Sequence, residues 1–492
     1  MAILDFFWLK FFKMSGIKID SLDKKVNLCR SIFGKYKNCK TGSEEIVEKF
    51  TWKTVNRLEI ALISFGATLT SIKAPDRNGN VADILLGFDD LEKTLLDDKC
   101  FFGSTFGRVS GLVKNGEYCM KGKYYQCPKN FKKKHMKNGG ALGFHKVNWL
   151  PTVVNETDVV LSHVSEHMTN GFPGNLLVQI VFSVSANNNL KISMSARSNL
   201  ETPVNLSNRL YFNLASHDSG KDELLDHIIN INSSKVCMNC EGIFKKKSLD
   251  VGLTDYNLRV PTTISDKIDK IPDGTFNHLY IIDGDPTPNT KKSLQFVSRI
   301  IYPSNGRVLE IFSNQPTVHF STCAHFPEEE NVLENPDEEL PKTDSMEYLT
   351  LDYLRQKLTD KEIRFFKCQL DTDSLKLSQK INVSEENICL DLNKILNEDQ
   401  DDEVSTEPIK GKDESIYTKN CGFFLECQHF PNAVNHQRQY PDIILKPGMV
   451  YENNLLLKFG IHIFYKKTCE PELFFPYKVP YYNTFPTSIN IL

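Results

Sequence analysis

Short apolar segments separated by turn residues dominate this chain and leave little room for long helices. Between residue 53 and about residue 326, few windows carry apolar residues at the 3.6-residue spacing of an amphipathic helix. The segments are rich in Val, Ile, Leu and Phe, and Gly, Pro, Asn and Asp separate them. We therefore predict an all-β fold, a large antiparallel β-sandwich, rather than alternating strands and helices.

Two places show this pattern clearly. Residues 178–184 and 190–195 are both β-patterned, and the Asn-rich residues 186–189 separate them, which predicts a hairpin. Residues 74–80 read Ala-Pro-Asp-Arg-Asn-Gly-Asn, which predicts a turn between two strands.

The composition becomes acidic and polar after residue 324. We expect residues 326–418 to be an acidic insertion that is disordered or, over residues 346–367, helical. No protein partner of this insertion can be named. Its removal leaves one discontinuous sandwich domain, residues 46–325 and 419–465.

Both ends of the chain lack the β pattern. Residues 1–45 are expected to be a poorly ordered leader, whose apolar start could alternatively lie on a membrane surface. Residues 466–492 are rich in Pro and aromatic residues and are expected to form an irregular C-terminal tail.

Charge and cysteine content exclude several classes of protein. The chain has 59 Lys and Arg against 62 Asp and Glu, a formal net charge of −3, so we expect no nucleic acid as a partner. It has no run of about 18 apolar residues, so we expect no transmembrane segment. The thirteen cysteines are irregularly spaced, which favours free thiols and a cytoplasmic location. Cys237 and Cys240 form only a lone pair, and we predict neither a metal nor a cofactor.

One carboxylate lies inside an apolar, β-patterned run. Residues 423–428 read Phe-Phe-Leu-Glu-Cys-Gln, and in a strand Glu426 would face away from Leu425 and Cys427. A glutamate there lies either on a solvated sheet face or in a cleft, where desolvation raises its pKa towards that of a useful base. The run by itself leaves both readings open.

A series of segments, in the same order along the chain, resembles the galactose mutarotase (aldose 1-epimerase) family, and the chain looks like a divergent member of it. The resemblance implies a galactose mutarotase-like supersandwich whose concave face holds a monosaccharide, and a reaction that interconverts the α and β anomers of aldohexoses such as galactose and glucose. The segments are residues 65–68, 75–79, 86–88, 102–109, 143–149, 171–174, 202–208, 211–215, 306–310, 315–316, 425–428, 431–435 and 445–448.

In this family a glutamate is the base and a histidine is the acid, while a second histidine, an arginine, an aspartate and a glutamine hold the sugar hydroxyls. By resemblance, Glu426 matches the base and Gln315 matches the glutamine. The other positions differ from the family. Arg209 replaces the acid histidine, Asn138 the second histidine, Asn277 the aspartate and Leu112 the arginine.

These substitutions predict impaired catalysis. A guanidinium does not release its proton near pH 7, so Arg209 cannot be the general acid, and it should pair with Glu426 and blunt the base. Another histidine could supply the acid, the candidates being His135, His217, His278, His319 and His429. The alternative is a non-catalytic carbohydrate-binding or interaction protein, in which Arg209 binds an anionic ligand such as a sugar phosphate.

Overall fold

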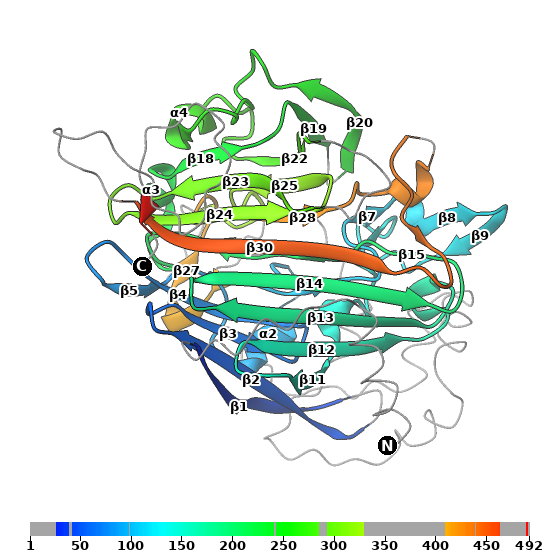
Figure 1. Ribbon diagram of the computed structural model, residues 1–492. Helices are drawn as coiled ribbons and strands as arrows, with labels where there is room; N and C mark the ends of the chain where they lie inside the picture. The colour runs from blue at the N-terminus through cyan, green and yellow to red at the C-terminus, as the bar shows by residue number, and fades with distance from the viewer. Residues whose placement is uncertain are drawn as a thin grey trace, which may run out of the picture.

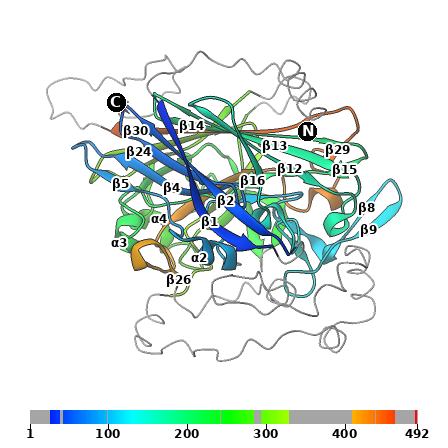
Figure 2. The ribbon, with the colours of Figure 1, turned by 90° about the horizontal axis from the view of Figure 1, so that it is seen from below.

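The computed structural model describes residues 26–38, 42–97, 99–240, 243–284, 293–328, 409–437, 439–462 and 489–490 (Figure 1). Most of the strand residues in this part of the chain belong to three large antiparallel sheets. The first sheet contains neighbouring strands in chain order, and Figure 2 shows its first two strands running obliquely to the long strands of the second sheet. These strands are β1 (Val26–Lys37), β2 (Glu44–Thr54), β3 (Glu59–Ile63), β4 (Thr68–Pro75) and β5 (Val81–Asp83).

The second sheet is the largest, with ten strands in the described part of the chain. Its centre combines distant segments, since β30 (Tyr451–His462) lies between β14 (Asn189–Ser198) and β24 (Arg307–Ser313) (Figure 1). The remaining strands are β11 (Leu150–Val153), β12 (Asp158–Ser165), β13 (Leu176–Ser185), β23 (Gln295–Ile301), β18 (Ile228–Ile231), β21 (Thr262–Thr263) and β31 (Ile489–Asn490).

The third sheet has six strands in the described residues and carries most of the candidate site. In spatial order they are β17 (Tyr211–Phe212), β28 (Phe423–Gln428), β25 (Thr317–Ser321), β22 (Asn277–Ile281), β19 (Lys235–Cys240) and β20 (Ile243–Asp250).

Five two-stranded pairs in the described residues lie outside these three sheets. They are β6 (Thr105–Phe106) with β16 (Ser207–Asn208), β7 (Leu112–Val113) with β10 (Met136–Lys137), β8 (Glu117–Met120) with β9 (Lys123–Gln126), β15 (Thr202–Pro203) with β29 (Ile444–Leu445), and β26 (Ile409–Lys410) with β27 (Ile416–Tyr417).

Helices in the described residues are short. The α-helices are α2 (Leu91–Leu96), α3 (Gly220–Leu225) and α4 (Ser265–Ile268), and the 3-10 turns are η1 (Lys114–Gly116), η2 (Phe144–Lys146), η3 (Thr169–Gly171), η5 (Lys412–Glu414) and η6 (Ala433–Asn435). None of the helices in these residues is long and apolar enough to span a bilayer.

One hydrophobic core joins the three sheets. It contains Trp52 and Leu62 from the first sheet, Ile180 and Leu457 from the second, and Phe320 from the third, each at most 1% exposed. Because removing apolar surface from water is the main favourable contribution to folding, this shared core holds the sheets in one unit.

The predicted fold class is confirmed. The Asn-rich connection joins β13 and β14, whose ladder begins with Ser185 opposite Asn189. Residues 74–80 turn between β4 and β5, and the Asp76 carboxylate accepts hydrogen bonds from the backbone N–H groups of Asn78 and Asn80, both at 2.8 Å. A short polar side chain that bonds to the backbone in this way stabilises a turn.

The expected leader, residues 1–45, has the wrong boundary. Strand β1 and the start of β2 lie within it and pair with each other, and Val47 and Phe50 of β2 are fully buried. These strands are difficult to recognise in the sequence, because the exposed residues of β1 outnumber its buried ones and the alternation of apolar and polar residues is weak. Residues 1–25 lie outside the described part of the chain.

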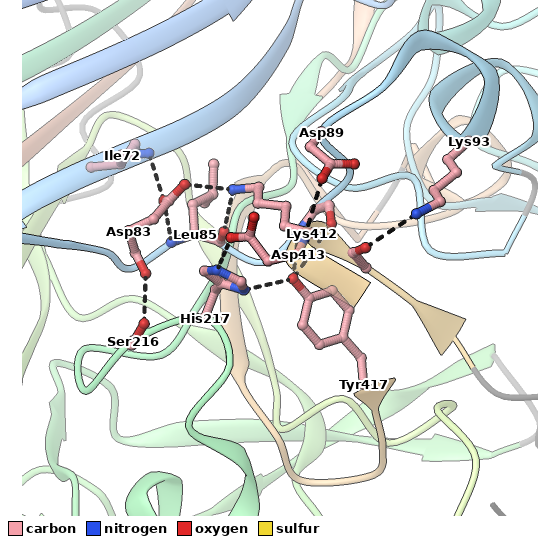
Figure 3. Close-up of polar contacts among 12 residues, drawn as sticks. Ile72, Asp83, Leu85, Asp89, Lys93, Ser216, His217, Lys412, Asp413 and Tyr417 are labelled. Atoms are coloured by element: carbon pink, nitrogen blue, oxygen red, sulfur yellow. Dashed lines mark hydrogen bonds and ion pairs between the residues drawn. The ribbon is translucent and has the colours of Figure 1, made fainter. Parts of the chain in front are cut away.

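The expected insertion, residues 326–418, also has the wrong C-terminal boundary. Residues 409–418, here termed the strap, pack against the sandwich (Figure 3). The Nζ atom of Lys412 lies 2.9 Å from Oδ2 of Asp83, and the Tyr417 hydroxyl lies 3.1 Å from Nδ1 of His217. The helix considered over residues 346–367, and nearly all of the tail from residue 466, lie outside the described residues.

Candidate active site

Strand β28 presents Glu426 on the face opposite to the shared core. Phe423, Leu425 and Cys427 point into that core, whereas Phe424 and Glu426 point to the other side, as the alternation of residues 423–428 predicts. The local sequence is thus enough to predict the direction of the carboxylate, but segments distant in the sequence supply its hydrogen-bond partners.

Glu426 is fully buried, and both of its carboxylate oxygens accept a hydrogen bond. Oε1 accepts from the Ser207 hydroxyl at 2.5 Å, and Oε2 accepts from Nε of Arg209 at 2.8 Å. The expected contact between Arg209 and Glu426 therefore forms. The solvated-face reading of Glu426 is wrong, since the exposed fraction of the residue is 0%.

Arg209 is held in place by two aromatic rings. It follows β16, and its backbone N–H donates to the carbonyl of Ser104 at 3.1 Å. The guanidinium carbon lies 4.8 Å from the ring centroid of Phe106 and 4.9 Å from that of Phe424. Burial alone would lower the pKa of Arg209, but the charge and hydrogen bond of Glu426, together with Tyr211, raise that pKa above its ordinary value. The side chain is therefore a fixed cation.

His319 on β25 lies beside this ion pair. It lies directly opposite Glu426 in the β25–β28 ladder, so both side chains leave the same face of the sheet. Its ring meets that of Phe424 edge-on at 4.9 Å. Burial, followed by the positive charge of Arg209, holds the pKa of His319 well below its ordinary value, so the ring is neutral near pH 7.

Asn277 joins the site through His319. Its Oδ1 lies 2.7 Å from Nε2 of His319, and because an amide oxygen only accepts hydrogen bonds, Nε2 carries the proton. Three of the residues expected at the site, Glu426, Arg209 and Asn277, are thus connected through the third sheet and its neighbouring loop.

Asn138 and Gln315 have no hydrogen bond to this group among the described residues. Oδ1 of Asn138 accepts from the backbone N–H of Gly111 at 3.2 Å, while its buried Nδ2 has no partner in the described part of the chain. Nε2 of Gln315 donates to Oδ1 of Asn314 at 2.8 Å. Both residues are buried, and each orients its amide through neighbouring loop residues.

The other candidate histidines form hydrogen bonds with groups other than Glu426 and Arg209. Three of these rings accept a backbone N–H at Nδ1: His135 from Asn115, His278 from Asn277 and His429 from Phe430. His217 contacts the strap. His319 is therefore the candidate that the fold brings to Glu426.

Sequence reasoning missed Ser207 and Phe106 as parts of the site. Both lie in segments that carry the resemblance, and Ser207 is two residues before Arg209, but nothing local shows that its hydroxyl reaches a carboxylate on β28. The β6–β16 pairing, with Phe106 opposite Ser207, brings both to Glu426 and Arg209.

The described residues contain no group of three or more His, Cys, Asp or Glu side chains placed to hold a metal ion. The chemistry available at the site is that of its side chains: one carboxylate engaged by two donors, one permanent cation and one neutral imidazole. Such a set can bind hydroxyls or an oxyanion.

Comparison with known proteins shows which family this chain resembles. A family model described as aldose 1-epimerase matches residues 48–347. Galactose mutarotase from Bos taurus is 27% identical over 437 residues, which cover 89% of this chain and 99% of the relative, and the protein of the same name from Rattus norvegicus is 26% identical over the same length.

Solved structures show the same fold. A GalM/aldose epimerase homologue from C. elegans superposes with a TM-score of 0.61 at 18% identity, covering 88% of this chain and 99% of that one. Galactose 1-epimerase from Lactobacillus acidophilus gives a TM-score of 0.58 at 16% identity, covering 88% of this chain and 98% of that one. Because the family model spans more than half of the 492 residues, this chain belongs to the aldose 1-epimerase family.

Proposed function

We propose that this protein binds an aldose at the site around Glu426 and Arg209, and that it interconverts the anomers far more slowly than a protein with a histidine at position 209. The ion pair between the two side chains carries this proposal. It rests also on the family, whose name denotes epimerisation at the first carbon of an aldose.

Mutarotation needs a base and an acid on opposite sides of the sugar. The base takes the proton from the C1 hydroxyl while the acid protonates the ring oxygen; the ring then opens, the aldehyde rotates, and the ring closes on the other face. A well-positioned acid or base contributes about 10²–10⁴ in rate, so the loss of one removes much of the catalytic effect.

Both roles are weakened here. Both oxygens of Glu426 already accept a hydrogen bond, so the carboxylate would have to break an ion pair before accepting the C1 proton. Arg209 keeps its proton at every physiological pH. The neutral His319 beside it is a poor proton donor near pH 7, because burial and, after it, the positive charge of Arg209 disfavour the imidazolium form.

The test is the change Arg209→His, with the equilibration of fresh α-D-galactose and α-D-glucose followed by polarimetry. We expect the variant to exceed the parent protein by a factor of about 10² or more, because it restores a titratable acid and releases Glu426. The control Arg209→His with Glu426→Gln should return to the rate in buffer. A parent protein that is already as fast as the single variant would overturn the proposal.

A second candidate function is sugar binding without catalysis. The full engagement of Glu426 favours it, since a carboxylate bonded in this way serves to position Arg209. A parent rate equal to that in buffer, together with calorimetric binding of galactose, would establish this function in place of slow catalysis.

A further inference from the structure

Lysines are concentrated in one stretch of the chain. Residues 111–150 contain nine lysines and a single acidic residue, Glu117, which gives this stretch a formal charge of +8. The whole chain carries −3, so the remaining residues carry −11. A strongly basic region in an otherwise acidic protein creates a local positive potential, and such an asymmetry of charge is typical of a surface that binds a polyanion.

The fold joins the segments of this stretch at the 3-10 turn η1. The backbone N–H of Asn115 in η1 donates to Nδ1 of His135 at 2.8 Å, and the N–H of Cys127, just after β9, donates to the carbonyl of Gly116 at 2.7 Å. A Cβ atom added to Gly116 would lie 2.9 Å from Cγ of Lys129, so this lysine packs directly against the turn. The segment after β9 and the turn at residues 131–135 are thus both held against η1.

Several lysines surround this junction. The Nζ atoms of Lys132 and Lys137 lie 5.7 Å and 4.6 Å from the ring centroid of Phe131, so both cations gather at one ring. The fully exposed lysines of these segments are Lys114, Lys129, Lys133 and Lys134. Burial first, and then the positive charges of Lys134, Lys114, Lys132 and Lys129, lower the pKa of His135, as expected for an imidazole that these cations enclose.

Most of this charge is available to a ligand. Lys121 pairs with Glu201, whose carboxylate lies 2.7 Å from its Nζ, whereas four other lysines have no carboxylate partner in the part of the chain that the structure describes. These are Lys114, Lys129, Lys132 and Lys134. A lysine without such a partner keeps its three donors and its full charge for an anion outside the protein.

The type of residue indicates the type of partner. Arginine presents a planar fork that binds a phosphate or carboxylate in a fixed geometry, whereas lysine is a point charge on a flexible stem. Residues 111–150 contain no arginine. Interfaces between proteins are also depleted in lysine. The stretch therefore suits a partner that presents many anions without fixed positions, as the headgroups of an anionic membrane do.

An exposed tyrosine supports this choice of partner. The hairpin of β8 and β9 projects from one end of the molecule in both ribbon views (Figure 1, Figure 2). On this hairpin Tyr124 is 78% exposed, and it follows the exposed Lys123, whose Nζ lies 5.2 Å from the ring centroid of Tyr125. Tyrosine and lysine both have an apolar body and a polar end, and such side chains are favoured where a membrane meets water.

We propose that this basic surface, formed by Lys114, Lys129, the lysines at 132–134 and Tyr124, binds the surface of a membrane that contains anionic lipids. The inference goes beyond the proposed function and does not depend on it, because none of these residues bonds to Glu426 or Arg209 in the described part of the chain.

The test is co-sedimentation of the full chain with sucrose-loaded vesicles. One set contains phosphatidylcholine alone, and in the other about one third of the lipid is phosphatidylserine. We expect binding to the anionic set at an ionic strength of about 0.05 M, and affinity for the neutral set at least about tenfold lower. The affinity for the anionic set should fall by about tenfold or more at about 0.5 M salt, because salt screens exposed charges.

The triple variant Lys132→Gln, Lys133→Gln and Lys134→Gln should bind the anionic vesicles about a hundredfold more weakly, since each lysine near such a surface contributes roughly fivefold in affinity. The matched control changes the net charge equally at three exposed lysines of other elements, and its affinity should stay within about threefold of that of the parent protein. These changes are Lys191→Gln, Lys221→Gln and Lys270→Gln. Unfolding temperatures of both variants, compared with that of the parent protein, show whether the fold is intact.

The comparison of the two triple variants is decisive, because both keep the apolar N-terminal sequence, which could bind a membrane by itself. Absence of binding to the anionic vesicles, equal affinity for both sets of vesicles, or an equal loss in both triple variants would overturn the inference. A single-stranded oligonucleotide of about 20 nucleotides that binds the parent protein while the anionic vesicles do not would overturn it in favour of a nucleic-acid partner. All of these outcomes leave the proposed function to its own test by polarimetry.

Discussion

Two histidines whose pKa values are lowered by burial make the stability of this protein depend on pH. His227 is fully buried, its Nδ1 lies 2.7 Å from the carbonyl oxygen of Glu223, and its Nε2 accepts the backbone N–H of Leu214 at 3.0 Å. This tautomer is neutral, and a second proton on Nε2 would break the bond to Leu214. Burial accordingly lowers the pKa of His227 to about 4. The same cause lowers the pKa of His163 to about 4.

We expect the free energy of unfolding to fall as the pH drops from about 6.5 towards 4. In that window the unfolded chain binds protons at these histidines and the folded protein does not, so each contributes up to about 1.4 kcal/mol per pH unit. Urea unfolding at a series of pH values measures this slope. His227→Gln should reduce it, whereas His167→Gln, at an exposed residue, should not; equal slopes would show that His227 does not titrate as expected.

At the scale of elements, the strap shows how a polar segment becomes part of a core. The side chain of Lys412 is 7% exposed, and its Nζ bonds to Asp83 Oδ2 at 2.9 Å and to the carbonyl of Leu85 at 2.6 Å (Figure 3). Burial alone would raise the pKa of Asp83, but the ion pair with Lys412, together with hydrogen bonds from Ser71 and the backbone of Ile72, holds it below its ordinary value. Tyr417 adds an edge-on ring contact to Phe102 at 5.6 Å.

The variant Lys412→Met should destabilise the protein by about 3 kcal/mol or more, because it leaves the carboxylate of Asp83 buried without its partner. The double variant Lys412→Met with Asp83→Asn should recover part of that loss. Lys410→Met, at an exposed residue of the same segment, should change stability by no more than about 0.5 kcal/mol. A Lys412→Met protein as stable as the Lys410→Met control in urea unfolding would contradict this role of the strap.

At the scale of the whole molecule, the described residues before residue 329 lie close to those that follow residue 408. The backbone N–H of Lys419 donates to the carbonyl of Pro327 at 2.8 Å, and that of Asn420 donates to the carbonyl of Thr322 at 3.1 Å. Strand β26 pairs with β27, so Ile409 also lies beside Tyr417. The chain on both sides of residues 329–408 is therefore already joined by hydrogen bonds.

We expect the replacement of residues 329–408 by a flexible Gly/Ser linker of about ten residues to preserve folding, since such a linker spans a short gap at little entropic cost. The replacement of residues 329–418 should instead destabilise the protein strongly, because it removes Lys412 and Tyr417 from the core. Circular dichroism and thermal unfolding compare the two proteins. A shorter deletion that fails to fold while the purified parent protein folds would refute the expectation.

The sequence by itself determined the fold class, the hairpin of β13 and β14, and the direction in which Glu426 points, because all three depend on alternation and turn residues within a few positions. Its resemblance to the family also placed Arg209 against Glu426. The predictions for residues 26–45 and 409–418 were wrong, because the exposed and polar residues of these segments give no sign of the strands or of the buried Lys412.

Only the tertiary structure decided what surrounds the carboxylate. Ser207, Phe106 and His319 are far from Glu426 along the chain, and strand pairing brings them to it. Local patterns set which face a residue occupies, but the partner across a ladder depends on register, which distant segments fix together.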